Sequence, residues 1–166
     1  MRNLQSFELS DKSKNSLAQW KKAQNPLKVI FNFCIMEICK FCPSLRLKRM
    51  LYRIVGIKIG KNAAIAPGVT FDFFFPELIE IGDNCIIGYG SLLLAHEFLV
   101  DKYTKGKVII GKNVLIGANC TILPGIKIGD NVKISAMSLV NSDIPANCFV
   151  GGVPAKVINK KEEEED

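Results

Sequence analysis

The chain has 166 residues, 48% of them hydrophobic, which is enough for one domain with a sizeable buried core. No apolar run reaches the ~20 residues that span a membrane, and the polar first residues do not look like a signal peptide. Both features predict a cytoplasmic protein. The net charge of +6 is uneven, because residues 1–61 hold 13 Lys and Arg against three acidic residues. The following residues are nearly neutral up to an acidic end.

Residues 1–55 are predicted to form a helical arm. The first 12 residues are expected to be disordered, and a short helix is expected within 13–24. A longer helix is predicted to begin at Asn25-Pro26, because Asn caps helices and Pro fits the first turn. It should end before Pro43, which discourages helical geometry in the residue before it.

A further helix is predicted after Ser44, which can act as its N-cap. Apolar residues recur there at helical spacing, and a second face is basic. The apolar positions are Leu47, Met50, Leu51, Ile54 and Val55, and the basic ones are Arg46, Arg49 and Arg53. Gly56 supplies a stop signal at the C-terminal end.

A strict period of six follows the arm. From Ile110 to Val140 an aliphatic residue returns at every sixth position, and Asn or Gly stands three places later in most repeats. The same register covers Ile59 to Phe71 and Ile81 to Leu93. Neither a helix nor an alternating strand has this period, whereas a parallel β-helix does. The aliphatic residues should fill the core, and Asn or Gly should form corners with positive φ. The sequence therefore predicts an all-β solenoid over 56–158.

The open end of a solenoid exposes apolar core and unpaired strand edges, so it needs a cap. We therefore predict that the arm 1–55 is an α-helical cap. An alternative is peripheral contact with a membrane through its basic amphipathic helix, and the two roles are compatible. Residues 159–166 are predicted to be an acidic, disordered tail.

The period slips twice, between Phe71 and Ile81 and between Leu93 and Ile110. Insertions in solenoids become loops, often on the binding face. The second insertion contains His96, the only histidine of the chain. One histidine does not supply the several ligands of a zinc site, so no metal is predicted.

Six cysteines are present. Cys34, Cys39 and Cys42 have a spacing that also occurs in iron–sulfur proteins, but no fourth ligand follows at a suitable distance. Cys85, Cys120 and Cys148 occupy repeat positions that require small residues. All six are interpreted as reduced, packed thiols.

Several segments, in order, resemble the hexapeptide-repeat acyltransferases, most closely the maltose, galactoside and nodulation-type O-acetyltransferases. They are Ile110–Asn119, Ile122–Asn131, Asp143-Ile-Pro and Gly152-Val-Pro-Ala-Lys156. The resemblance implies a left-handed β-helix, a hand taken from the family and contrary to the usual crossover rule. It also implies a homotrimer that binds acetyl-CoA in clefts between adjacent solenoids.

The resemblance also implies site residues. His96 matches the catalytic histidine, and Ala118, next to Gly117, matches a residue whose backbone N–H faces the thioester carbonyl. The remaining coenzyme positions are Ala136, Asn141, Ser142 and, near the phosphates, Lys156. Asp72 and Glu97 are candidates for contacting the acceptor.

A base is required because an alcohol or amine loses a proton when it attacks a thioester. An imidazole, with an ordinary pKa near ~6.5, can take that proton near neutral pH. Glu97 or Asp101 could orient the ring. We predict transfer of an acetyl group to a sugar or glycan hydroxyl, with no nucleic-acid partner. Transfer to an amine, a packed histidine without a catalytic role, and a non-catalytic solenoid that serves as an assembly platform stay open.

Overall fold

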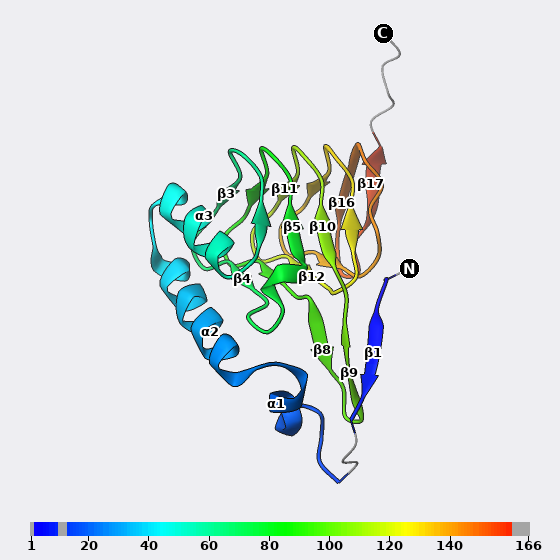
Figure 1. The fold of residues 1–166 in the computed structure, drawn as a ribbon. Helices are drawn as coiled ribbons and strands as arrows, with labels where there is room; N and C mark the ends of the chain where they lie inside the picture. Colours follow the sequence, from blue (N-terminus) through cyan, green and yellow to red (C-terminus); the bar gives the residue numbers. More distant parts are fainter. Residues whose placement is uncertain (1, 10–12, 161–166) are drawn as a thin grey trace.

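The computed structural model describes residues 2–9 and 13–160 and contains a parallel β-helix with three faces (Figure 1). The first face contains β2 (Lys58–Ile59), β5 (Ile79–Ile81), β10 (Val108–Ile110) and β13 (Lys127–Ile128). The second contains β3 (Ala64–Ile65), β6 (Ile86–Ile87), β11 (Leu115–Ile116), β14 (Lys133–Ile134), β16 (Cys148–Gly151) and β17 (Lys156–Lys160). The third contains β4 (Thr70–Phe71), β7 (Leu92–Leu93), β12 (Thr121–Ile122) and β15 (Leu139–Val140).

The hexad positions stack in register and form the core, as predicted. On the first face, Ile59 pairs with Ile81, and Ile81 pairs with Ile110. On the third face, Phe71 pairs with Leu93, which pairs with Ile122. These side chains are at most 7% exposed. Only the last pairing, β16 with β17, is antiparallel among the solenoid strands that the structure describes.

Asparagines form the corners between faces, which confirms the prediction from the repeat. Six asparagines have φ between 54° and 61°, a region that most residues with a Cβ avoid. Asn84, Asn113, Asn131 and Asn147 also form a side-chain ladder, with amide hydrogen bonds of 2.9 to 3.1 Å from each to the next. The ladder uses the polar groups that these corners expose.

The second insertion forms a hairpin that projects from the solenoid (Figure 1). It consists of β8 (His96–Phe98) and β9 (Lys102–Lys105), and β1 (Gln5–Glu8) pairs antiparallel with β9. The expectation of disorder is wrong for β1. The hairpin has a free edge, and an extended segment can satisfy it. Residues 10–12 lie outside the described residues, as do 161–166 of the predicted tail, while Asn159 and Lys160 end β17.

The helices of the arm begin where the sequence predicts. In α2 (Pro26–Phe41) the Asn25 side chain accepts a hydrogen bond from the Leu27 N–H, and in α3 (Leu45–Ile54) Ser44 does the same for Leu47. The predicted first helix consists of a short 3-10 turn, η1 (Leu17–Gln19), followed by α1 (Trp20–Ala23). Another 3-10 turn, η2 (Pro76–Leu78), lies in the first insertion.

The basic side of α3 covers the first coil, a choice that the two faces seen in the sequence left open. Lys48 donates to the carbonyls of Ile65 and Ala66 at 2.9 and 2.8 Å, and Arg49 donates to Ala63 at 3.0 Å. Arg53 donates to Ile59 in the same way. Strand edges present unpaired carbonyls, and cationic donors satisfy them better than aliphatic side chains do.

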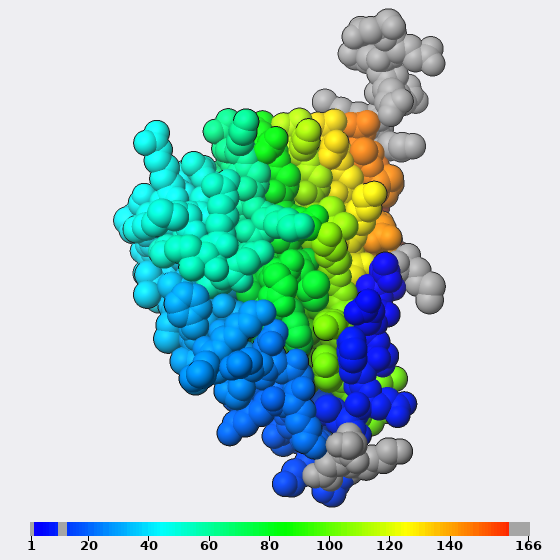
Figure 2. Space-filling view, in the orientation of Figure 1, coloured from blue at the N-terminus to red at the C-terminus, as the bar shows by residue number. Residues whose placement is uncertain are grey.

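The predicted apolar side of α3 therefore mostly faces solvent. Leu47, Met50 and Ile54 are exposed, Leu51 is half-buried, and Val55 alone of that set is buried. Figure 2 shows α2 and α3 on the outside of the first end of the solenoid. Neither helix is long and apolar enough to span a bilayer, which holds for every helix of the described residues.

Candidate active site

His96 lies where the chain leaves the third face of the solenoid. Strand β7 ends at Leu93, Ala95 is buried, and the Gly106 N–H closes the base of the hairpin by donating to the Ala95 carbonyl at 2.9 Å. The hairpin therefore starts from a fixed point. The His96 side chain is 13% exposed, so one part of the ring remains accessible.

Asp72 holds the His96 ring. Its carboxylate is completely buried and makes a short contact with His96 Nδ1. The same carboxylate accepts backbone N–H groups from Ala95 and His96 at 2.8 and 2.9 Å, and from Phe74 and Phe75 at 2.9 and 3.1 Å. Five donors on one buried carboxylate satisfy its oxygens and fix its position.

Two sequence-based assignments therefore change. Asp72 was predicted to contact the acceptor, but its side chain has no exposed surface and its oxygens are occupied within the protein. Glu97 pairs with Arg2 at 2.8 Å, and Asp101 is exposed in the turn of the hairpin, so neither orients the ring. The hexad register could have identified Asp72 as the partner of His96. It pairs Phe71 with Leu93 and so places Asp72 beside Leu94, two residues before His96.

Aromatic rings surround the imidazole. Its centroid lies 4.8 Å from that of Phe74, 5.6 Å from that of Phe75 and 4.9 Å from that of Phe98. The arm supports this cluster, because Asn32 donates to the Phe73 carbonyl at 2.9 Å and Trp20 packs edge-on against Phe74. The rings exclude water from most of the imidazole, and charge interactions strengthen where water is excluded.

The geometry assigns the two ring nitrogens of His96. Because the Asp72 carboxylate accepts only, the contact at Nδ1 requires a proton there. In the neutral ring, Nε2 then carries the free lone pair. An acceptor–His–carboxylate arrangement of this kind can remove a proton from a bound alcohol or amine and stabilise the resulting imidazolium.

The predicted coenzyme positions fall into two groups. Gly117 and Ala118 lie at the corner between β11 and β12, and Ala136 lies at the corner above them, between β14 and β15. A Cβ added to Gly117 would come within 2.4 Å of the Ala136 nitrogen, so the two corners touch. No described residue accepts a hydrogen bond from the Ala118 N–H, which leaves that donor available.

Asn141 and Ser142 form the other group with the C-terminal segment. Both are exposed at the end of β15, and Lys156 is exposed at the start of β17. The segment is tied to β15, because the Ala155 N–H donates to the Leu139 carbonyl at 2.7 Å.

The two groups lie on opposite edges of the third face. His96 and Asn141 follow the strands of that face, whereas Gly117, Ala118 and Ala136 precede them. One chain therefore does not gather all the predicted positions into one cluster.

Met137 was not identified from the sequence. It has φ of 61° at a corner where equivalent positions carry Asn119 and Gly90, and its side chain is 67% exposed next to Ala136. A large apolar side chain in this conformation is uncommon, and it adds an apolar contact surface to the corner.

Comparison with known proteins places the chain in a family. The sequence model described as "Hexapeptide repeat of succinyl-transferase" matches residues 107–137. The Bacillus subtilis (strain 168) protein named "Putative acetyltransferase YvoF" is 49% identical over 138 residues, which cover 82% of this chain and 80% of that protein. The chain belongs to the hexapeptide-repeat acetyltransferases.

Solved structures of hexapeptide-repeat acetyltransferases have the same fold. A Vibrio cholerae acetyltransferase solved with acetyl coenzyme A has a TM-score of 0.70 at 21% identity, covering 82% of this chain and 88% of that one. A galactoside acetyltransferase solved with coenzyme A has a TM-score of 0.62 at 26% identity, covering 86% and 90%. The predicted left-handed β-helix is confirmed.

The cysteines of this hexapeptide-repeat acetyltransferase are all free thiols. Burial raises the pKa of Cys85 and of Cys120, which disfavours their nucleophilic thiolate forms. Cys34 is exposed, Cys39 is buried and Cys42 is half-buried. Among the described residues no group of three His, Cys, Asp or Glu side chains could hold a metal ion.

Proposed function

We propose that the protein is an acetyl-CoA-dependent O-acetyltransferase in which His96 is the general base. The observation that carries the proposal is the contact between the buried Asp72 carboxylate and His96 Nδ1, which leaves Nε2 as a proton acceptor. The acceptor is a sugar or glycan hydroxyl. Family membership supports the acetyl donor, and the galactoside acetyltransferase of similar structure supports a sugar acceptor.

The reaction is a direct transfer. His96 Nε2 takes the hydroxyl proton while the acceptor oxygen attacks the thioester carbonyl and forms the new C–O bond. The carbonyl oxygen becomes negative, and the Ala118 N–H donates to it. The C–S bond then breaks, and the imidazolium returns its proton to the coenzyme thiolate. No acetyl-cysteine forms.

The site lies between copies of the chain in a homotrimer. The separation of His96 from the corner of Gly117, Ala118 and Ala136 supports this, because a second copy could bring its corner to the first copy's His96. Three copies with closed symmetry would form three such sites. The six free cysteines support a cytoplasmic location, because thiols stay reduced there.

The Asp72→Asn variant tests the pairing that carries the proposal. An amide at this position can offer an N–H to Nδ1 and so favour the wrong tautomer, and kcat should fall by up to about 10⁴-fold. The KM for acetyl-CoA should change little. Turnover is measured by thiol release with a panel of sugars and amino sugars, and the melting temperature checks the fold.

Three results would contradict the proposal. They are full turnover of a folded Asp72→Asn enzyme, transfer to amino groups only, and no thiol release with any acceptor. The last, together with no coenzyme binding, would favour a non-catalytic platform. A monomer in light scattering would contradict the shared site.

A further inference from the structure

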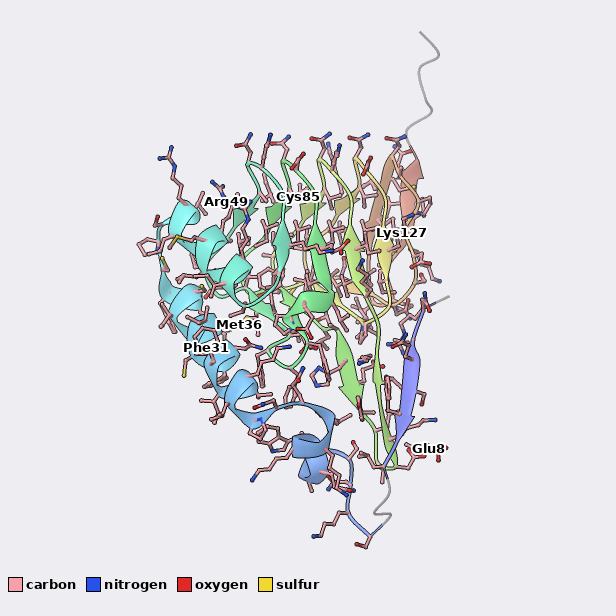
Figure 3. The ribbon with its side chains drawn as sticks, viewed as in Figure 1. Glu8, Phe31, Met36, Arg49, Cys85 and Lys127 are labelled. Carbon is pink, nitrogen blue, oxygen red and sulfur yellow. The ribbon has the colours of Figure 1, made fainter. Side chains whose placement is uncertain are left out.

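The outward side of α2 is apolar along its whole length. Residues at spacings of three and four along one side of the helix are exposed, and none of them is charged. They are Leu27, Ile30, Phe31, Cys34, Ile38 and Phe41. Leu27 is 77% and Phe41 is 84% exposed. Figure 3 shows Phe31 on the outer side of the helix and Met36 on the side of the solenoid.

The outward side of α3 is apolar as well. Leu47, Met50 and Ile54 are exposed on the side opposite the buried Lys48 and Tyr52. These three residues and the six of α2 are called the apolar face below. Soluble proteins normally turn such a stripe toward the core, so its exposure over two consecutive helices indicates an interaction surface.

The inward sides of both helices explain why the apolar face cannot turn inward. Lys48, Arg49 and Arg53 of α3 are bound to carbonyls of the first coil. In α2, Asn32 is bound to Phe73 beneath the helix. The residues outside the described ranges carry one apolar side chain, Met1, so they offer no apolar segment that could cover the face.

Cationic side chains flank the apolar face. Residues 20–61 contain ten Lys and Arg and a single acidic residue, Glu37. Exposed members include Lys21 and Lys22 on α1, Arg46 on α3 and Lys61 on the first coil, whereas the exposed Lys58 is paired with Glu80 at 2.7 Å. An apolar stripe with cationic flanks is complementary to a surface that is negative outside and apolar beneath.

We propose that the apolar face of α2 and α3 docks on an anionic lipid bilayer. The helices lie in the plane of the membrane interface, with the apolar side chains among the acyl chains and the cationic flanks at the phosphates. Neither helix is long and apolar enough to cross the bilayer. A lipid surface fits better than a folded partner, because the stripe contains no polar or charged group that would orient one.

The experiment is flotation of the full chain with vesicles. Binding to equimolar phosphatidylcholine and phosphatidylglycerol should exceed binding to phosphatidylcholine alone and should weaken with salt. The Phe31→Ser/Ile38→Ser/Phe41→Ser variant should bind at least about tenfold more weakly, because it loses three apolar anchors. Val157→Ser/Ile158→Ser is the matched control, since both residues are exposed at the other end of the solenoid and should not affect binding.

A charge variant separates the two parts of the interaction. Lys21→Glu/Lys22→Glu/Arg46→Glu should remove the preference for anionic vesicles. Phe41→Ser alone, at the most exposed position, is the substitute if the triple apolar variant fails to fold. Three results would overturn the proposal: wild type that does not float with anionic vesicles, folded apolar variants that float as well as wild type, and self-association through this face without flotation. Because none of these readouts involves acetyl transfer, they do not depend on the proposed function.

Discussion

The solenoid and the helical arm distribute apolar side chains in opposite ways. In the solenoid, Ile116 and Ile122 point inward and are completely buried. In the arm, Ile38 and Ile54 point outward and are more than half exposed, while Lys48 is buried. The difference arises from the partner of each element. Each coil of the solenoid packs its aliphatic side chains against those of the neighbouring coils, whereas α3 packs on backbone carbonyls that require hydrogen-bond donors.

This contrast predicts that catalysis and surface binding are separable. The His96→Ala variant should lower kcat by about 10²- to 10⁴-fold, the usual contribution of a general base, and should leave vesicle binding unchanged. Steady-state kinetics and flotation of the same preparation check both statements. Full turnover without His96, or a trapped acetyl-cysteine, would contradict the mechanism.

The contrast also predicts unequal costs for the same substitution. Ile116→Ala removes a buried side chain and should lower the free energy of unfolding by about 2–5 kcal/mol. Ile54→Ala, in the arm, should change it by less than ~0.5 kcal/mol, because the side chain is 57% exposed. Chemical unfolding followed by circular dichroism measures both variants. Similar losses of unfolding free energy at the two positions would show that the apolar side of α3 is buried in solution.

The inverted packing of α3 depends on Lys48. Lys48→Met keeps the volume of the side chain but leaves the carbonyls of Ile65 and Ala66 without this donor. Unfolding should require about 1–3 kcal/mol less free energy, the cost of unsatisfied buried groups. The control is Arg46→Met, at an exposed position of the same helix, which should have little effect. If Lys48→Met is as stable as wild type, the carbonyl contacts do not hold the cap.

The smallest expected effect is a pH dependence of the arm. Burial raises the pKa of the Cys39 thiol from 9.0 to about 11. Below pH 9.0 the thiol is protonated in both states, so its contribution to stability is complete there. As pH rises from 9 toward 11, only the unfolded chain releases the proton, and about 1–2 kcal/mol should be lost.

Replacement of Cys39 tests this dependence. Cys39→Ala should reduce the loss of thermal stability between pH 9 and 11, whereas Cys34→Ala, at an exposed position of the same helix, should not. Melting temperatures across this range provide the measurement. Identical alkaline curves for wild type and Cys39→Ala would rule out the thiol as the titrating group.

The sequence by itself determined the solenoid. A period of six fixes which residue of each repeat points inward, and the asparagines fix the corners, because few other residues adopt positive φ at low cost. The starts of α2 and α3 were also local, since Asn25 and Ser44 cap helices through their own side chains. His96 could be identified as the candidate catalytic base because it is the only histidine of the chain and lies in an insertion.

Tertiary structure decided what these elements contact. Asp72 orients His96 because β4 and β7 are paired, although 24 residues separate the two side chains in the sequence. The amphipathic pattern of α3 identified two faces but not which of them is buried, because periodicity does not specify the chemistry of the surface beneath the helix. That surface is a row of strand carbonyls, and it selected the cations.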